Sequence, residues 1–79
     1  MTLADALSAR LEELMKEKEI TQYRLSQLSG VAQSSIADIR LKRNKGANIS
    51  LIYAISAGLG IDLTEFFNSE FFKAENITD

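Results

Sequence analysis

The chain has 79 residues, nine of them lysine or arginine and eleven aspartate or glutamate, with no histidine, cysteine, proline or tryptophan. A chain this short buries only roughly 60–65% of its surface on folding, so we expect one domain with a modest core and no large enzyme cleft. Without cysteine or histidine it has no disulfide framework, no thiolate nucleophile and no imidazole base. We therefore expect no catalytic residue, no metal site and no cofactor.

No segment approaches the ~20 apolar residues that a membrane span requires. The first residues also lack the basic and then apolar layout of a signal peptide. These features predict no membrane association and a soluble, cytoplasmic protein.

Charge is segregated along the sequence. Residues 20–50 carry five basic side chains and one acidic one, for a net charge of +4, whereas residues 1–19 and 51–79 sum to -2 and -4. A basic middle segment can present one positive face to a phosphate backbone even when the whole chain is acidic. Charge alone would make the run from Arg40 to Lys45 an ordinary solvated loop.

Apolar spacing predicts helices joined by short turns. The first has Thr2 as its N-cap and Asp5 in its first turn, and its stripe of leucines at spacings of 4, 4 and 3 ends near Glu19. The leucines of that stripe are Leu3, Leu7, Leu11 and Leu14. A second, short helix follows Thr21 and ends at Gly30, a residue that adopts positive φ at little cost. We expect Leu25 and Leu28 to face inward from this second helix.

The third helix has Ala32 at its N-cap position and Val31, Ile36 and Ile39 as its apolar residues, and a polar, basic loop follows over residues 42–47. Asn48 is the N-cap expected for the fourth helix, which Gly60 closes. The residues expected to be buried from this helix are Ile49, Ile52, Ile55 and Leu59.

A carboxylate capping box, Asp62 with Glu65, begins the fifth helix, and Phe66 and Phe67 follow it. The predicted fold class is all-α: a compact five-helix domain over residues 1–72, with residues 73–79 a polar tail that frays.

Residues 22–40 meet the requirements of a helix-turn-helix unit. Two helices of about eight residues flank a tight turn at Gly30, Ser26 provides the small side chain where the helices touch, and apolar residues wedge the second helix onto the first. On residues 4–67 the sequence resembles the phage-repressor, Cro/cI-like helix-turn-helix regulators of the xenobiotic-response-element type. The motifs that match are Thr-Gln at 21–22, Gly-Val at 30–31, Gln-Ser-Ser-Ile at 33–36, Gly-Ile at 60–61 and Leu-Thr-Glu-Phe-Phe at 63–67.

The resemblance implies a lambda-repressor-like fold whose third helix lies in the DNA major groove with its N-terminal residues at the base edges. The candidates for base contact on its outer face are Gln33, Ser34, Ala37 and Asp38. Gln33 is the best of these, because a carboxamide can donate and accept together and so pair with adenine. The candidates for phosphate contact are Gln22, Arg24, Ser35, Arg40, Lys42, Arg43, Lys45 and Asn48.

Apolar residues remain beyond those that a small core needs. They suggest a two-fold dimer interface, built from Leu51, Tyr53, Phe67, Phe71 and Phe72. The alternative is that the C-terminal segment folds back and covers the first or fifth helix. A symmetric dimer would space two recognition helices about 34 Å apart and so match a palindromic operator.

Two functions are therefore open. One is a sequence-specific regulator of transcription, a repressor that binds double-stranded DNA as a homodimer without a cofactor. The other is a protein-interaction module on the same scaffold, of the antitoxin or anti-repressor type, whose apolar C-terminal surface holds a partner protein. The basic run and Gln33 favour the regulator, and the acidic flanks favour the interaction module.

Overall fold

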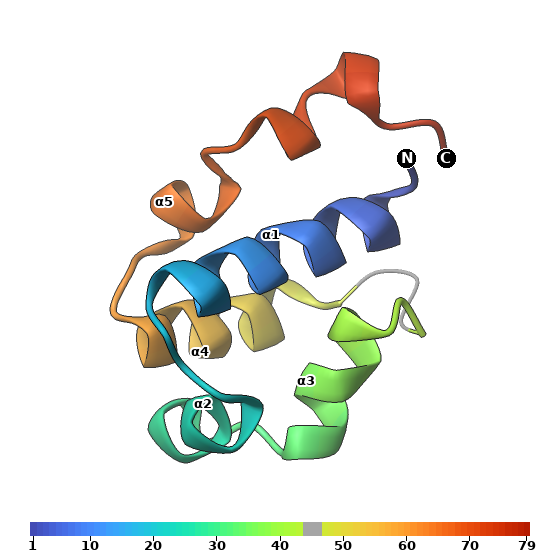
Figure 1. Ribbon diagram of the computed structural model, residues 1–79. Coiled ribbons are helices and arrows are strands. Elements are labelled where there is room, and N and C mark those ends of the chain that lie inside the picture. The colour runs from blue at the N-terminus through green and yellow to red at the C-terminus, as the bar shows by residue number, and fades with distance from the viewer. Residues whose placement is uncertain (44–46) are drawn as a thin grey trace.

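The computed structural model describes residues 1–43 and 47–79, and every regular element within these ranges is helical (Figure 1). The elements are α1 (Leu3–Glu17), α2 (Gln22–Ser29), α3 (Gln33–Arg40), α4 (Ile49–Leu59), α5 (Leu63–Phe67) and the 3₁₀ turns η1 (Glu70–Phe72) and η2 (Ala74–Asn76). This arrangement confirms the predicted all-α class with five α-helices. None of the helices in the described ranges is both long and apolar enough to cross a bilayer.

Local side-chain chemistry sets where the helices begin. The Thr2 hydroxyl accepts from the Asp5 backbone N–H at 3.1 Å, and the Thr2 N–H donates to the Asp5 carboxylate at 2.9 Å, which completes a capping box for α1. Thr21 and Asn48 cap α2 and α4 in the predicted way. At α5 the Asp62 carboxylate accepts from the Glu65 N–H at 2.8 Å, which is one of the two hydrogen bonds of the capping box expected there.

The ends of α2 and α4 are set by glycine. Gly30 and Gly60 have φ values of 73° and 77°, in the left-handed region where a side chain would be strained. The predicted ends of both helices are thus confirmed. The start of α3 differs from the other helices, because Ala32 provides no side-chain cap.

Two apolar residues that we expected in the core are exposed. Ile49 is 59% exposed because it is the first residue of α4 and precedes the turn that enters the core. Leu28 is 49% exposed because it lies on the flank of the short α2, rotated away from the buried Leu25. On α4, Ser56 is buried beside Ile52 and Ile55, and its hydroxyl donates to the Ile52 carbonyl at 2.8 Å.

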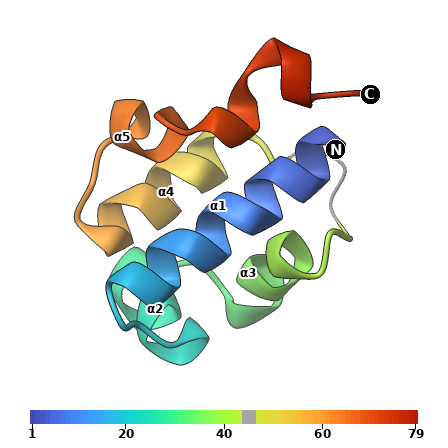
Figure 2. The same cartoon turned by 45° about the horizontal axis from the view of Figure 1, so that its top comes forward.

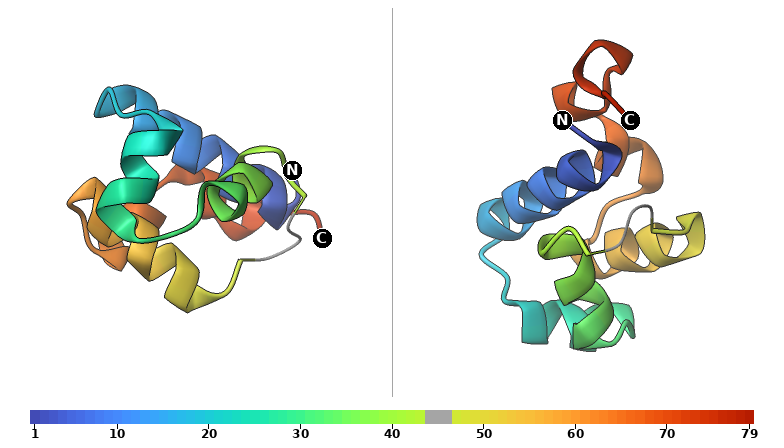
Figure 3. Two further views of the ribbon diagram at one scale, coloured as in Figure 1. Left: turned by 90° about the horizontal axis from the view of Figure 1, so that it is seen from below. Right: turned by 90° about the vertical axis from the view of Figure 1, so that its right-hand side faces the viewer.

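The helix-turn-helix pair and the C-terminal turns lie at opposite ends of the molecule. α2 packs against α3 and α4, while α1 contacts α3 on one side and η1 on the other. Figure 1 and the right-hand view of Figure 3 show α1 between the α2–α3 pair and the C-terminal turns. The face built by α2 and α3 is therefore left uncovered by the C-terminal segment.

Three phenylalanine rings form a cluster at the C-terminal end. Phe66 is fully buried; its ring centroid lies 5.2 Å from that of Phe67 and 6.2 Å from that of Phe72, and Phe67 and Phe72 are 5.0 Å apart. Both Phe67 and Phe72 are partly buried against the core. The segment after α5 therefore folds back over α1, as one of the two interpretations of the sequence proposed.

The chain ends lie side by side in Figure 2 and are joined by hydrogen bonds. The Thr78 N–H donates to the Met1 carbonyl at 2.9 Å, and the Leu3 N–H donates to the Asp79 carboxylate at 2.9 Å. The domain boundary at residue 72 and the fraying of residues 73–79 stay predictions.

Candidate nucleic-acid interface

The turn between α2 and α3 is held by two serines. The Ser26 hydroxyl donates to the Val31 carbonyl at 2.6 Å, and the Ser29 hydroxyl accepts from the Val31 N–H at 3.1 Å. Behind the turn, Leu25 and Ile36 are fully buried and press the two helices together. The position of α3 relative to α2 is thus set by packing and by side-chain hydrogen bonds at once.

The polar side of α3 faces outward. Gln33 and Ser34, in its first turn, are exposed, and Ala37 and Asp38, one turn later, are half-buried. Ile36 and Ile39 occupy the opposite side of the helix and are buried. Because helix N-terminal residues are the ones that reach base edges in helix-turn-helix complexes, this side has the exposure that DNA contact requires.

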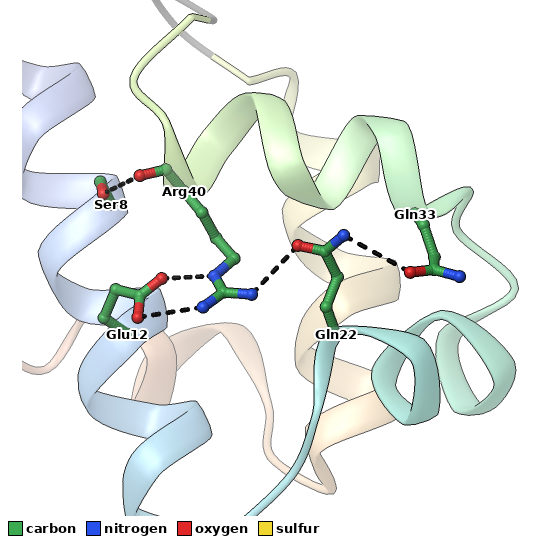
Figure 4. Close-up of polar contacts among 5 residues, drawn as sticks. All are labelled: Ser8, Glu12, Gln22, Gln33 and Arg40. Carbon is green, nitrogen blue, oxygen red and sulfur yellow. Dashed lines mark hydrogen bonds and ion pairs between the residues drawn. The ribbon is translucent and has the colours of Figure 1, made fainter.

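A chain of polar contacts leads from α1 to the start of α3 (Figure 4). The Arg40 guanidinium donates from Nε and Nη2 to the two carboxylate oxygens of Glu12, and from Nη1 to Gln22 Oε1 at 3.0 Å. Gln22 Nε2 in turn lies 3.5 Å from Gln33 Oε1. The Arg40 carbonyl accepts from the Ser8 hydroxyl at 2.7 Å, which fixes the end of α3 against α1.

The basic side chains that follow α3 also have carboxylate partners. Lys42 Nζ lies 3.6 Å from Asp5 Oδ1, and Arg43 Nε donates to Asp38 Oδ1 at 3.1 Å. Exposed pairs of this kind contribute about 0–1 kcal/mol, so a phosphate can replace the carboxylate at low cost. The positive segment of the sequence is therefore partly neutralised in the fold.

The pKa of Asp5 is lowered. The main cause is the hydrogen bond from the Thr2 backbone N–H. Desolvation, the second-largest effect, raises the pKa, and the charge of Lys42 is a smaller effect that lowers it. Asp5 is thus ionised at neutral pH, and it links the cap of α1 to the segment after α3.

Comparison with known families decides the assignment. A family model described as the Cro/C1-type HTH DNA-binding domain matches residues 10–71. The chain belongs to this family. The match confirms the family that the sequence motifs indicated.

One solved structure similar to this Cro/C1-type domain is the crystal structure of the wild-type restriction-modification controller protein C.Esp1396I. The TM-score is 0.76 at 24% sequence identity, over 85% of this chain and 86% of that one, which shows that the fold is shared. No curated protein sequence matches the chain.

The residues of this Cro/C1-type domain that we expected to contact DNA differ in their contacts within the protein. Arg24 on α2 is exposed, and its guanidinium donates a hydrogen bond to Gln27 at 3.3 Å. The Asn48 side chain is occupied as the cap of α4, where it accepts from the Leu51 N–H at 2.8 Å. Ser35 is half-buried, and Lys45 lies outside the described residues.

The sequence did not predict that Asp5 and Glu12, two carboxylates of α1, pair with Lys42 and Arg40. Each is far from its partner along the chain, and acidic residues on an exposed helix face carry no signal that distinguishes these two from their neighbours.

The apolar surface expected to form a dimer is only partly open. Tyr53 is 61% exposed, whereas Leu51, Phe67, Phe71 and Phe72 are half-buried. Ile49 lies one turn before Tyr53 on α4, on the same face, and lines a surface depression with Leu63 and Phe67. The open part of this surface thus combines the start of α4 with α5, and Ile49 belongs to it although we expected this residue in the core.

Proposed function

We propose that this Cro/C1-type domain is a sequence-specific regulator of transcription that inserts α3 into the major groove of double-stranded DNA. The observation that carries this proposal is the exposure of Gln33 and Ser34 at the first turn of α3, on the side opposite its buried residues. Family membership supports DNA as the ligand. A domain seated on an operator excludes other proteins from that DNA, so the proposed outcome is repression.

The proposed base contacts come from the outward side of α3. Gln33 has a carboxamide that pairs with a base edge, Ser34 bonds to a base or a phosphate, and the methyl group of Ala37 suits contact with a thymine methyl. Asp38 accepts from a cytosine amino group when it is released from Arg43. These four residues lie within six consecutive positions, fewer than two turns of the helix, and a major groove is wide enough to admit an α-helix.

The proposed phosphate contacts surround the base-contacting residues. Cations from the chain before and after α3 neutralise phosphates and release counterions, which makes binding weaken as salt rises. The proposed residues are Gln22, Arg24, Ser35, Lys42, Arg43, Lys45 and Asn48. Arg40 differs from Lys42 and Arg43, because all three nitrogens of its guanidinium have hydrogen-bond partners within the protein.

We propose that two copies of the domain associate through the apolar surface around Tyr53 and together bind a palindromic operator. A monomer of this size makes few phosphate contacts, and a two-fold dimer doubles them while setting the two α3 helices about 34 Å apart.

Measurements of duplex binding at two salt concentrations test the proposal. Duplexes enriched from a random-sequence pool should be retained, and the logarithm of the binding constant should fall linearly with the logarithm of the salt concentration. The Gln33→Ala variant should bind the enriched duplex more weakly by about 1–3 kcal/mol while binding to unselected DNA stays nearly unchanged. Gln27→Ala, which removes the same group from α2, is the control and should keep its selectivity.

Two results would contradict the proposal. If Gln33→Ala lowered the affinity for the enriched duplex and for unselected DNA equally, Gln33 would not be a base-contacting residue. Absence of salt-dependent duplex binding in the unaltered protein would favour the protein-interaction module instead.

A further inference from the structure

The Arg40 side chain is turned into the protein rather than toward solvent. Its side chain is 32% exposed, compared with 56% for Lys42 and 60% for Arg43, the two cations that follow it. Its guanidinium contacts Glu12 on α1 through two nitrogens and Gln22 on α2 through the third. All three guanidinium nitrogens thus have partners within the protein. An arginine that contacts a phosphate would instead leave nitrogens available to it.

The contacts of Arg40 determine which way the carboxamide groups of Gln22 and Gln33 are oriented. A guanidinium only donates, so the group of Gln22 that faces Arg40 must be its oxygen, and its NH₂ group must face Gln33. Gln33 therefore presents its own oxygen to Gln22, and its Nε2 has no hydrogen-bond partner among the described residues. Figure 4 shows this nitrogen on the side of Gln33 away from Gln22.

We propose that Glu12 is a positioning residue for base recognition, which acts through Arg40 and Gln22 to hold the Gln33 carboxamide with its NH₂ group toward the DNA. The inference rests on the proposed function and deepens it. A donor held in this direction favours base pairs that offer a major-groove acceptor to it, such as a purine N7, the guanine O6 or the thymine O4. In this proposal Arg40 connects Glu12 to Gln22 within the protein and is not a phosphate contact.

Glu12 is needed because a carboxamide has nearly the same shape in its two orientations. Without a partner for its guanidinium, Arg40 would be free to leave Gln22, and nothing else in the described chain would hold the Gln22 oxygen on that side. The Gln33 carboxamide would then present either its oxygen or its nitrogen, and discrimination between base pairs would fall although every base-contacting side chain is still present.

The test compares Glu12→Ala with Glu17→Ala. Both variants remove one negative charge from an exposed position on α1, but the Glu17 side chain has no hydrogen-bond or ion-pair partner among the described residues, so the comparison cancels the general effect of charge on DNA binding. The measured quantity is the ratio of affinities for an enriched duplex and for the same duplex with the Gln33-dependent base pair exchanged. Glu12→Ala should lower this ratio about 3- to 10-fold, part of the discrimination of a good base contact, and Glu17→Ala should leave it unchanged.

Coupling to Gln33 separates positioning from a merely structural effect. In a Gln33→Ala background, Glu12→Ala should have no further effect on the ratio, because the group that it orients is gone. An equal effect in both backgrounds would overturn the inference. So would a rise in affinity for all duplexes at an unchanged ratio, which would mean that Glu12 only restrains a phosphate-binding arginine.

Arg40 provides a second route if Glu12→Ala folds poorly. Arg40→Lys keeps the charge but cannot reach Glu12 and Gln22 at once with a planar group, so the ratio should fall while the salt dependence stays the same. In Arg40→Gln, which removes the charge, a decrease of about one in the salt slope would identify Arg40 as a phosphate contact and overturn the inference. An unaltered protein that shows Gln33-dependent binding, together with an unchanged ratio in Glu12→Ala, would reject this inference alone and leave the proposed function in place.

Discussion

Gly58 of α4 lies directly against Ser29 at the end of α2, so that a Cβ on Gly58 would be 2.7 Å from the Cβ of Ser29 and 3.0 Å from its Cα. This contact brings α4 onto the helix-turn-helix unit at the point where Ser29 also accepts from the Val31 N–H. The orientation of α2 thus depends on the absence of a side chain at position 58.

Gly58→Ala should destabilise the protein. Alanine gains about 1 kcal/mol over glycine in a helix, but the added methyl group forces α2 and α4 apart, and overpacking costs about 1–3 kcal/mol. The expected net loss is about 1–2 kcal/mol in the free energy of unfolding, measured by urea denaturation. The neighbouring Ala57→Gly, which removes a side chain from an exposed position of the same helix, is a control for the effect of glycine itself. A Gly58→Ala variant more stable than the unaltered protein would show that α2 and α4 can move apart without cost.

Ala32→Ser should stabilise the protein by about 1 kcal/mol. α3 is the one α-helix in residues 1–43 and 47–79 whose N-cap residue makes no side-chain hydrogen bond, and Ala32 already has an extended backbone with ψ of 143°. A serine hydroxyl there can accept an N–H from the first turn of α3. Thermal or urea unfolding measures the gain, with Ala57→Ser, the same change inside α4, as a control that should lose stability. No gain at position 32 would mean that the hydroxyl does not reach the first turn.

Arg10→Met should be strongly destabilising. Arg10 is 9% exposed and donates to the carbonyls of Phe66 and Glu65, each at 2.7 Å, so it ties α1 to the end of α5. Loss of these charge-assisted bonds should cost about 2–3 kcal/mol in the free energy of unfolding. Arg10→Lys should recover only part of it, because an ammonium cannot match the planar fork. The exposed Arg24→Met is the control and should change stability little.

The capping contribution of Asp5 should disappear in acid. Its pKa in the folded protein lies below the unfolded value of 3.8, so the stabilisation is present above that value and is lost as the pH falls through the folded pKa. The difference in unfolding free energy between the unaltered protein and Asp5→Asn should therefore be constant near neutral pH and shrink below about pH 4. A difference that stays constant down to strongly acidic pH would show that the charge of Asp5 has no role.

Tyr53→Asp should convert the proposed dimer into a monomer, as measured by sedimentation equilibrium. A carboxylate at the centre of an apolar interface would be buried without a partner, which opposes association. Tyr23→Asp is a matched control, because Tyr23 on α2 is 60% exposed and Tyr53 is 61% exposed. An unchanged mass in the Tyr53 variant would place the interface elsewhere. Phe72 is less suitable as a probe, since its ring packs on Phe66 and Phe67 and its removal would also disturb the core.

The sequence by itself determined where the helices begin and end and to which family the chain belongs. A cap such as Thr2 or Thr21 acts on a backbone N–H three residues away, and Gly30 ends α2 through its own backbone conformation, so each signal is complete within a few residues. The outward direction of Gln33 and Ser34 could also be predicted, because the buried Ile36 and Ile39 define the opposite side of α3.

Only the tertiary structure decided which side chains meet across the fold. Leu28 and Ile49 are apolar and correctly spaced, yet they are exposed: Leu28 lies on the flank of the short α2, and Ile49 is the first residue of α4. The pairing of Arg40 with Glu12, 28 residues away, depends on how α3 packs against α1. The sequence contains several carboxylates that could pair with each basic residue, and it does not indicate which one does. Such pairs, and the inward turn of Phe72, follow from the packing of distant segments, for which local sequence contains no information.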